Sequence, residues 1–180
     1  MVALQILLEQ VTVFYNVGKH NNIRLEGADW NDGFDMAEEN GESVAFTAFY
    51  ASNLMELSKL LISMKEKLGI EELEVAKEIL VLIDSISGKI DYNSVNEKNN
   101  LLDNYFKLCI HNVSGEKVKI NINELSKDLE KKAIWIINHI RKNEWIKNSE
   151  GFEWFNGYYD NAGKALEGDF TSGVRVIRFP

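Results

Sequence analysis

Proline is almost absent from this chain of 180 residues, and its absence is the feature that most constrains the fold. The one proline is Pro180, at the last position. A proline inside a helix removes a backbone hydrogen bond and clashes with the preceding turn, so helices here are free to run long. Apolar residues recur at helical spacing in most of the sequence, and we expect helices over 3–17, 43–68, 71–86, 98–112 and 123–146. We expect Ser43 and Asn123 to cap the N-termini of the helices over 43–68 and 123–146, and Gly69 to stop the former.

These expected helices are of two kinds. The first half of the helix over 43–68 is apolar or small on nearly every side, which is typical of a buried helix. The helix over 71–86 is amphipathic, with a core face of Leu73, Ala76, Leu80 and Ile83. Polar residues alternate with Val118, Ile120 and Ile122, which predicts a short extended segment. The sequence therefore predicts a single all-α domain over residues 1–180, with one small extended segment.

Composition excludes several classes of protein. A hydrophobic content of 45% excludes a disordered chain. The single cysteine, Cys109, excludes an internal disulfide and fits a reducing compartment, so we expect the cytoplasm. We see neither a secretory signal nor an apolar run long enough to span a membrane. The net charge of -8 argues against binding to a nucleic-acid backbone, which needs clustered basic residues.

The negative charge is concentrated near the N-terminus. Residues 1–58 hold two basic and nine acidic side chains, and 25–58 hold no basic side chain. Residues 19–41 show no sustained period and contain three glycines, which indicates a long loop. Loops of about 20 residues in compact domains are more often functional than idle. For His20, which begins this loop, we expect a contact with the C-terminal dipole of the preceding helix.

The centre of the loop groups hydrogen-bonding side chains around one tryptophan. Trp30 is flanked by Asp29, Asn31 and Asp32. Sugars are bound in this way, because an aromatic face covers the C–H side of the ring while Asp and Asn reach its hydroxyls. A second aromatic segment offers another wall for such a site, through Trp154, Asn156, Tyr158, Tyr159, Asp160 and Asn161.

Two other interpretations of the loop stay open. The first offers calcium ligands in Asp29, Asn31, Asp35 and Glu42, but an EF-hand needs glycine at the sixth position, and Gly33 is fifth when counted from Asp29. Alternatively, Trp30 anchors a core and the acidic residues cap turns.

The motif Gly27-Ala28-Asp29-Trp30-Asn31-Asp32-Gly33, followed by Gly41-Glu42-Ser43-Val44, resembles the inverting glycoside phosphorylases of glycoside hydrolase family 94. These include cellobiose, chitobiose and β-1,2-oligoglucan phosphorylases and the related domain of cyclic β-1,2-glucan synthases. The segment 155–163 is similar to a later aromatic loop of the same family. The pairing of both motif halves, in order, is more specific than either half alone.

The resemblance implies an (α/α)6 barrel of alternating inner and outer helices, of which this chain is a fragment that we expect to be inactive alone. It also implies reversible phosphorolysis of a β-linked disaccharide or oligosaccharide, with inversion, to an α-sugar 1-phosphate. Asp32 is then the general acid, Trp30 lines the sugar subsite and Asp29 supports it. We expect Asn31, Tyr158 and Asp160 to bind substrate as well.

The resemblance implies inorganic phosphate as co-substrate, with no cofactor and no metal. We also expect self-association, because a partial barrel would expose inner-helix residues such as Phe46, Phe49 and Tyr50. The alternative function is a non-catalytic carbohydrate-binding or helical assembly module that uses the same aromatic loops.

Overall fold

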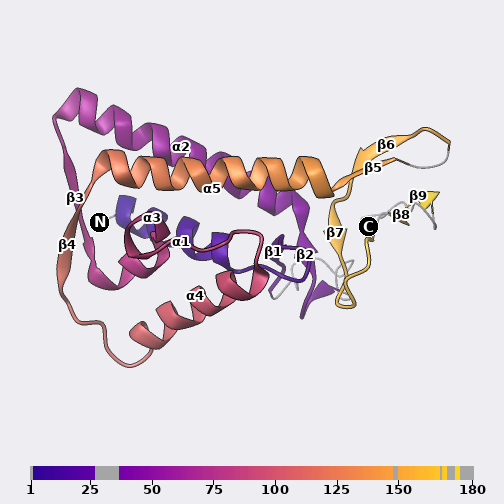
Figure 1. Ribbon diagram of the computed structural model, residues 1–180, viewed down its shortest axis with the longest axis horizontal. Coiled ribbons are helices and arrows are strands. Elements are labelled where there is room, and N and C mark those ends of the chain that lie inside the picture. Colours follow the sequence, from indigo (N-terminus) through magenta and orange to yellow (C-terminus); the bar gives the residue numbers. More distant parts are fainter. Residues whose placement is uncertain (1, 27–36, 148–149, 167, 170–172, 175–180) are drawn as a thin grey trace. The chain divides into compact units, whose positions relative to one another are not determined.

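The computed structural model describes residues 2–26, 37–147, 150–166, 168–169 and 173–174, and Figure 1 shows its elements. The helices are α1 (Val2–Tyr15), α2 (Val44–Leu68), a 3-10 helix (Lys77–Leu82), α3 (Asp84–Ser87), α4 (Val95–Cys109) and α5 (Ile122–Asn143). The strands are β1 (Ile23–Arg24), β2 (Glu42–Ser43), β3 (Glu72–Ala76), β4 (Lys117–Asn121), β5 (Trp145–Lys147), β6 (Glu153–Phe155), β7 (Tyr158–Tyr159), β8 (Gly168–Asp169) and β9 (Gly173–Val174).

The chain divides into two compact units, and each is described by itself. Unit 1 comprises residues 1–16 and 50–135, and unit 2 comprises residues 17–49 and 136–180. The expectation of one domain stays a prediction.

The core of unit 1 is built around aromatic rings. Phe14, near the end of α1, packs edge-on against Tyr15 and Tyr92, with ring centroids 4.9 Å apart in both pairs. Trp135 closes the same cluster at 6.0 Å from Phe14. Such edge-to-face packing places the positive ring edge against the negative face of the neighbouring ring. The cluster is surrounded by buried aliphatic side chains, which include Leu54, Leu82, Ile83, Ile122, Leu125 and Leu129.

Strands β3 and β4 form an antiparallel ladder in unit 1, which Figure 1 shows as two adjacent strands. The ladder confirms the extended segment expected over 118–122. It also shows that the helix expected over 71–86 is wrong, because this stretch contains β3, the 3-10 helix and α3. Cross-strand charges fit the register: Lys117 Nζ lies 2.8 Å from Glu74 Oε1, and Lys119 Nζ lies 3.5 Å from Glu72 Oε2.

The expectation of an all-α fold is therefore wrong, and so is that of part of an (α/α)6 barrel. The fold is mixed, with a three-stranded sheet and three two-stranded ladders beside the helices of the described ranges. The physical reason is that short runs of alternating residues find partners far away in the sequence. Periodicity within one segment does not reveal such partners.

Unit 2 contains the three-stranded sheet β1-β2-β7 and the hairpin of β5 and β6. Helix α2 begins directly after β2, and its N-cap is Ser43 as predicted, because Ser43 Oγ accepts from Phe46 N at 3.0 Å. The predicted stop at Gly69 is also confirmed, since this residue adopts a φ of +68°. The apolar core of unit 2 includes Val17, Ile23, Val44, Ile136, Ile140 and Ile146.

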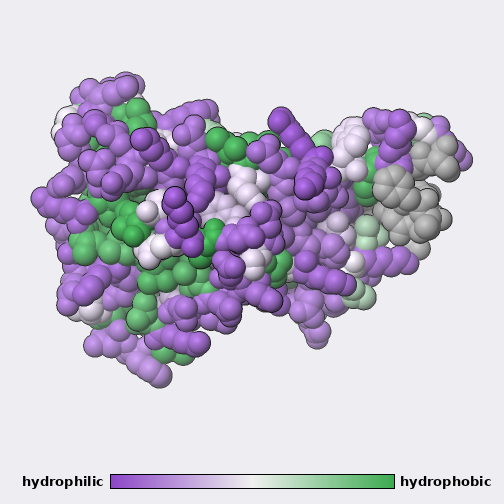
Figure 2. Space-filling view, in the orientation of Figure 1, coloured by the Kyte–Doolittle hydropathy of each residue, from purple (hydrophilic) through white to green (hydrophobic). Residues whose placement is uncertain are grey.

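Apolar residues interrupt a mostly hydrophilic surface in Figure 2. The exposed large ones include Phe46 and Phe49 on α2, with exposed fractions of 38% and 60%. Both therefore face solvent in this chain, while the self-association that we expected on that ground stays a prediction. Within the described residues, no helix combines the length with the apolar character that a membrane span requires.

Candidate functional site

The sheet β1-β2-β7 joins the two motif segments that the sequence analysis singled out. Arg24 pairs with Glu42, and Glu42 pairs in turn with Tyr159 on the other side of β2. Ser43 has Ile23 and Tyr158 as its neighbours. The structure thus brings the C-terminal aromatic segment next to the strand that follows the motif loop.

Glu42, in the centre of this sheet, is a buried carboxylate with an exposed fraction of 1%. It accepts hydrogen bonds from the backbone amides of His20 and Asn22, both at 3.0 Å. The turn over 18–22 therefore wraps around the carboxylate. A Cβ atom on Gly18 would lie 2.4 Å from Glu42 Cγ, so only glycine leaves room for this approach.

The ring of His20 is held between an acid and an aromatic ring. His20 Nδ1 lies 2.9 Å from Glu42 Oε1, and the ring stacks on Tyr159 with a centroid distance of 3.7 Å and an interplanar angle of 6°. Because a carboxylate only accepts, Nδ1 carries the proton, and a neutral ring then has its lone pair on Nε2. The structure thus shows an acid–imidazole pair at His20, while the expected contact with the helix dipole stays a prediction.

Glu144, directly after α5, is a second buried carboxylate in unit 2. It accepts from Asn22 Nδ2 at 2.7 Å, from the Tyr159 hydroxyl at 2.8 Å and from Asn156 Nδ2 at 3.2 Å. Burial, followed by the nearby charge of Glu144, raises the pKa of Tyr159. The tyrosine therefore stays a neutral donor at physiological pH.

Asn22 connects the two carboxylates, since its backbone amide donates to Glu42 and its side chain donates to Glu144. The salt bridges of the described residues pair neither carboxylate with a lysine or arginine. Hydrogen bonds from amides, a phenol and an imidazole therefore stabilise both charges, which is the arrangement that buried ions need. We call Glu42, Glu144, His20, Asn22, Tyr159 and Asn156 the carboxylate network.

The four predicted loop residues Asp29, Trp30, Asn31 and Asp32 lie outside the described residues. Both ends of their loop are described, and they are joined: Leu25 N donates to Gly41 O at 2.8 Å, and Gly41 N donates to Ala37 O at 3.0 Å. The described flanks of the motif loop, which we call the loop base, are thus held together by backbone hydrogen bonds.

Asn161 ties this base to the C-terminal segment. Its Oδ1 accepts from the backbone amides of Glu39 and Asn40, at 3.0 and 2.8 Å. Tyr158 packs against Leu25 and Ala37 on the same base. Two regions more than a hundred residues apart in sequence are therefore held together where the motif loop begins and ends.

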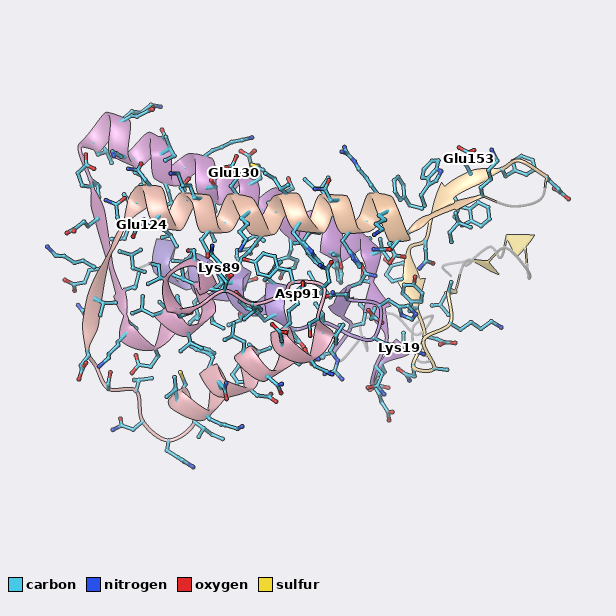
Figure 3. All side chains as sticks on the ribbon, viewed as in Figure 1. Lys19, Lys89, Asp91, Glu124, Glu130 and Glu153 are labelled. Carbon is cyan, nitrogen blue, oxygen red and sulfur yellow. The ribbon has the colours of Figure 1, made fainter. Side chains whose placement is uncertain are left out.

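Asp160, the other predicted substrate-binding residue that the structure describes, closes a turn. Its Oδ1 accepts from Ala162 N at 3.0 Å and from Lys164 N at 2.7 Å. Lys19, which is labelled in Figure 3, lies beside this turn: its Nζ atom would be 3.6 Å from a Cβ atom added to Gly163. The substrate-binding roles of Tyr158 and Asp160 stay predictions.

From the sequence, Glu42 was considered only as a possible calcium ligand, Asn22 only as part of the end of the first helix, and Glu144 was given no role. Glu42 was visible as part of the second motif half, but nothing in the sequence marks Glu144, which follows a helix like many surface glutamates. As for metals, the described residues include no group of three or more His, Cys, Asp or Glu side chains that could hold an ion.

A second polar cluster lies in unit 1, around the buried carboxylate of Asp84. Lys132 Nζ lies 2.8 Å from Asp84 Oδ1 and also pairs with Asp128, while the Tyr92 hydroxyl donates to Asp84 at 2.6 Å. Burial acts to raise the pKa of Asp84, but the charge and hydrogen bonds of Lys132 outweigh it, so the pKa is lowered. This cluster is enclosed by the aromatic core, which identifies it as a stabilising element.

Compared with known protein families and with curated protein sequences, the chain matches no family model and no curated protein.

Proposed function

We propose that this chain is part of the catalytic domain of a glycoside phosphorylase that acts on β-linked glucosides. The observation that carries the proposal is the two-part motif Gly-Ala-Asp-Trp-Asn-Asp-Gly and Gly-Glu-Ser-Val, in order and a few residues apart. The proposal does not depend on a barrel, which the fold lacks.

The sheet β1-β2-β7 supports the proposal. The motif loop leaves β1 and returns into β2, and β2 pairs with the aromatic segment at Tyr158 and Tyr159. A sugar site needs an aromatic face and several hydrogen-bonding groups that converge. The sheet gives the described ends of the loop and the aromatic segment a common base, and Trp30 and Asp32 belong to that loop in the sequence.

In the proposed reaction, Asp32 donates its proton to the glycosidic oxygen while phosphate attacks the anomeric carbon from the opposite side. The carbon–oxygen bond to the leaving sugar breaks, and a bond to a phosphate oxygen forms with inversion. Because phosphate is already an anion, the second catalytic carboxylate that activates water in an inverting hydrolase is not needed. Asp29, Trp30 and Asn31 orient the sugar.

Sugar binding by the 180-residue chain tests this proposal. We expect isothermal titration calorimetry to detect binding of cellobiose or of the β-1,2-linked glucose disaccharide. Trp30→Ala should abolish it, because the aromatic face of the subsite is removed. Asp32→Asn should bind at near-native affinity, since an amide keeps the hydrogen-bonding shape of the acid.

The matched control is Trp145→Ala, which removes an exposed tryptophan of the β5–β6 hairpin that is not part of the motif. It should leave the affinity unchanged. A native chain that binds neither disaccharide, or a Trp30→Ala chain that binds as well as the native one, would contradict the proposal.

A further inference from the structure

Unit 2 contains a cavity of about 410 Å³ next to the carboxylate network. Its volume lies within the range of small-molecule sites, roughly 300–1,000 Å³. Three elements line it: the start of α2, the end of α5 and the segment after β6. The lining residues are Val44, Ala45, Ala48, Ile137, Ile140, Arg141, Phe155, Asn156 and Gly157.

Most of this lining is apolar, which selects against a sugar. The hydroxyls of a bound pyranose would have no hydrogen-bond partners on the aliphatic wall, and burying each unpaired hydroxyl costs free energy. Phe155 makes one side of the cavity aromatic, and its ring packs edge-on against Trp145 with ring centroids 4.6 Å apart. The lining therefore suits a flat apolar body.

Asn156 supplies a specific polar contact in this apolar setting. Its exposed fraction is 1%, and its Nδ2 donates to the Glu144 carboxylate at 3.2 Å. Because Glu144 only accepts, the amide nitrogen of Asn156 makes this contact and the carbonyl oxygen does not. That Oδ1 atom is buried and has no hydrogen-bond partner among the described residues. An unsatisfied buried acceptor of this kind costs about 1–3 kcal/mol, which a donor on a bound molecule would recover once a small rotation of the side chain opens the atom to the cavity.

Arg141 adds a positive charge to the lining. It lies on the last turn of α5, is exposed, and makes no ion pair within the part of the chain that the structure describes. A guanidinium at the edge of an apolar cavity favours an anionic group on the bound molecule.

We propose that this cavity binds a small aromatic anion that carries one N–H or O–H donor. The aromatic body lies against Val44, Ala48 and Phe155, the donor reaches Asn156 Oδ1, and the anionic group pairs with Arg141. Among the described residues, this lining contains neither Tyr158 nor Asp160, the substrate-binding residues that the resemblance implies.

Two fluorescent probes test the proposal on the full chain. Anilinonaphthalene sulfonate has an aromatic body, an N–H donor and an anionic group, and phenylnaphthylamine has the first two without the anion. We expect both to bind and to compete for one site. Arg141→Gln should weaken the binding of the sulfonate probe roughly two- to fivefold, as expected for the loss of an exposed ion pair. The same change should leave the affinity for phenylnaphthylamine unchanged.

Filling the cavity should abolish the binding of both probes. Ala48→Trp places a large side chain at an exposed position of the lining, and Ala45→Phe does the same from the preceding turn. Because both positions are exposed, at least one of the two variants should keep the native far-ultraviolet circular dichroism spectrum. The N-methyl derivative of phenylnaphthylamine, which lacks the donor, should bind about two- to tenfold more weakly, as for one lost hydrogen bond.

Phe106→Ala is the control for unspecific binding to exposed aromatic rings, since Phe106 is 51% exposed in unit 1. It should bind both probes like the native chain. The proposal is overturned if a folded cavity-filling variant binds the probes unchanged, if Arg141→Gln affects both probes equally, or if the N-methyl derivative binds as tightly as its parent.

Discussion

Replacing the buried lysine of α4 tests the energetics of unit 1. Lys98 has an exposed fraction of 0%, and its Nζ lies 3.7 Å from the centroid of the Trp135 ring and 4.3 Å from that of Phe14. Burial, followed by the charge of Lys132, lowers the pKa of Lys98 to about 6. The aromatic faces attract a cation, but they do not replace the water that an ammonium group loses.

The lowered pKa predicts how stability depends on pH. Between pH 6 and the ordinary lysine value of 10.5, the unfolded chain binds a proton at Lys98 that the folded chain does not. Stability therefore rises with pH in this window, by about 1.4 kcal/mol per pH unit. From pH 7 to pH 9 the native chain should gain about 3 kcal/mol from this residue alone.

Other titratable groups near Lys98 do not change the sign of this pH dependence of stability. Asp84 stays ionised from pH 7 to pH 9, since the charge and hydrogen bonds of Lys132 lower its pKa, and Lys132 also pairs with Asp128. Burial raises the pKa values of Tyr15 and Tyr92, so neither hydroxyl ionises in this window.

The assay is urea unfolding of the native chain and of Lys98→Met at pH 7, 8 and 9. Lys98→Met keeps the length and apolar stem of the side chain and removes its titration. It should be more stable than the native chain at pH 7 and should lose the rise of about 3 kcal/mol. Lys107→Met, at an exposed position of the same helix, is the control and should keep the rise. A native chain with flat stability from pH 7 to pH 9, or an unchanged rise in Lys98→Met, would refute the reasoning.

The carboxylate network and the base of the motif loop give three further predictions. Gly18→Ala should lower the free energy of unfolding by roughly 1–3 kcal/mol, because its Cβ would lie 2.4 Å from Glu42 Cγ; an unchanged melting temperature would contradict this. Glu144→Gln should lower the free energy of unfolding, measured in urea, by about 2–3 kcal/mol. Three donors converge on the carboxylate, and the amide group of the new glutamine would point its own donor at one of them. Asn161→Ala should speed hydrogen exchange at the amides of Glu39 and Asn40 without affecting the amides of β4, and equal exchange in both chains would show that the contact does not hold the loop base.

The sequence predicted the helices where one face was clearly apolar and an end signal was present. Ser43 and Gly69 mark the ends of α2 because capping is local chemistry between neighbouring residues. At α5 the same reasoning chose the wrong residue: Asn123 was the expected cap, but Asn121 Oδ1 accepts from Asn123 N and the helix begins at Ile122. Asn121 and Asn123 are equally suitable as N-cap residues by their chemistry. Which of them caps the helix depends on where strand β4 ends, and it ends at Asn121.

The strands could not be predicted in the same way, because their partners are distant. Leu73, Ala76, Leu80 and Ile83 fit a helical face, yet Leu73 pairs with Ile120 across β3 and β4. The carboxylate network was equally hidden, since Asn22 and Glu144 meet across more than a hundred residues. The sequence did single out the motif loop and the aromatic segment, and the sheet β1-β2-β7 joins the described ends of that loop to Tyr158 and Tyr159.

The most direct test is the titration of Asp32 by carbon-detected nuclear magnetic resonance, with the carboxyl carbon labelled and a bound β-linked glucose disaccharide present. We predict that this carboxyl loses its proton at least one pH unit above the usual aspartate midpoint of about 3.9, because an acid must still hold its proton when it meets the leaving oxygen. A midpoint at the usual value, unmoved by saturating disaccharide, would contradict the assignment of Asp32 as the proton donor.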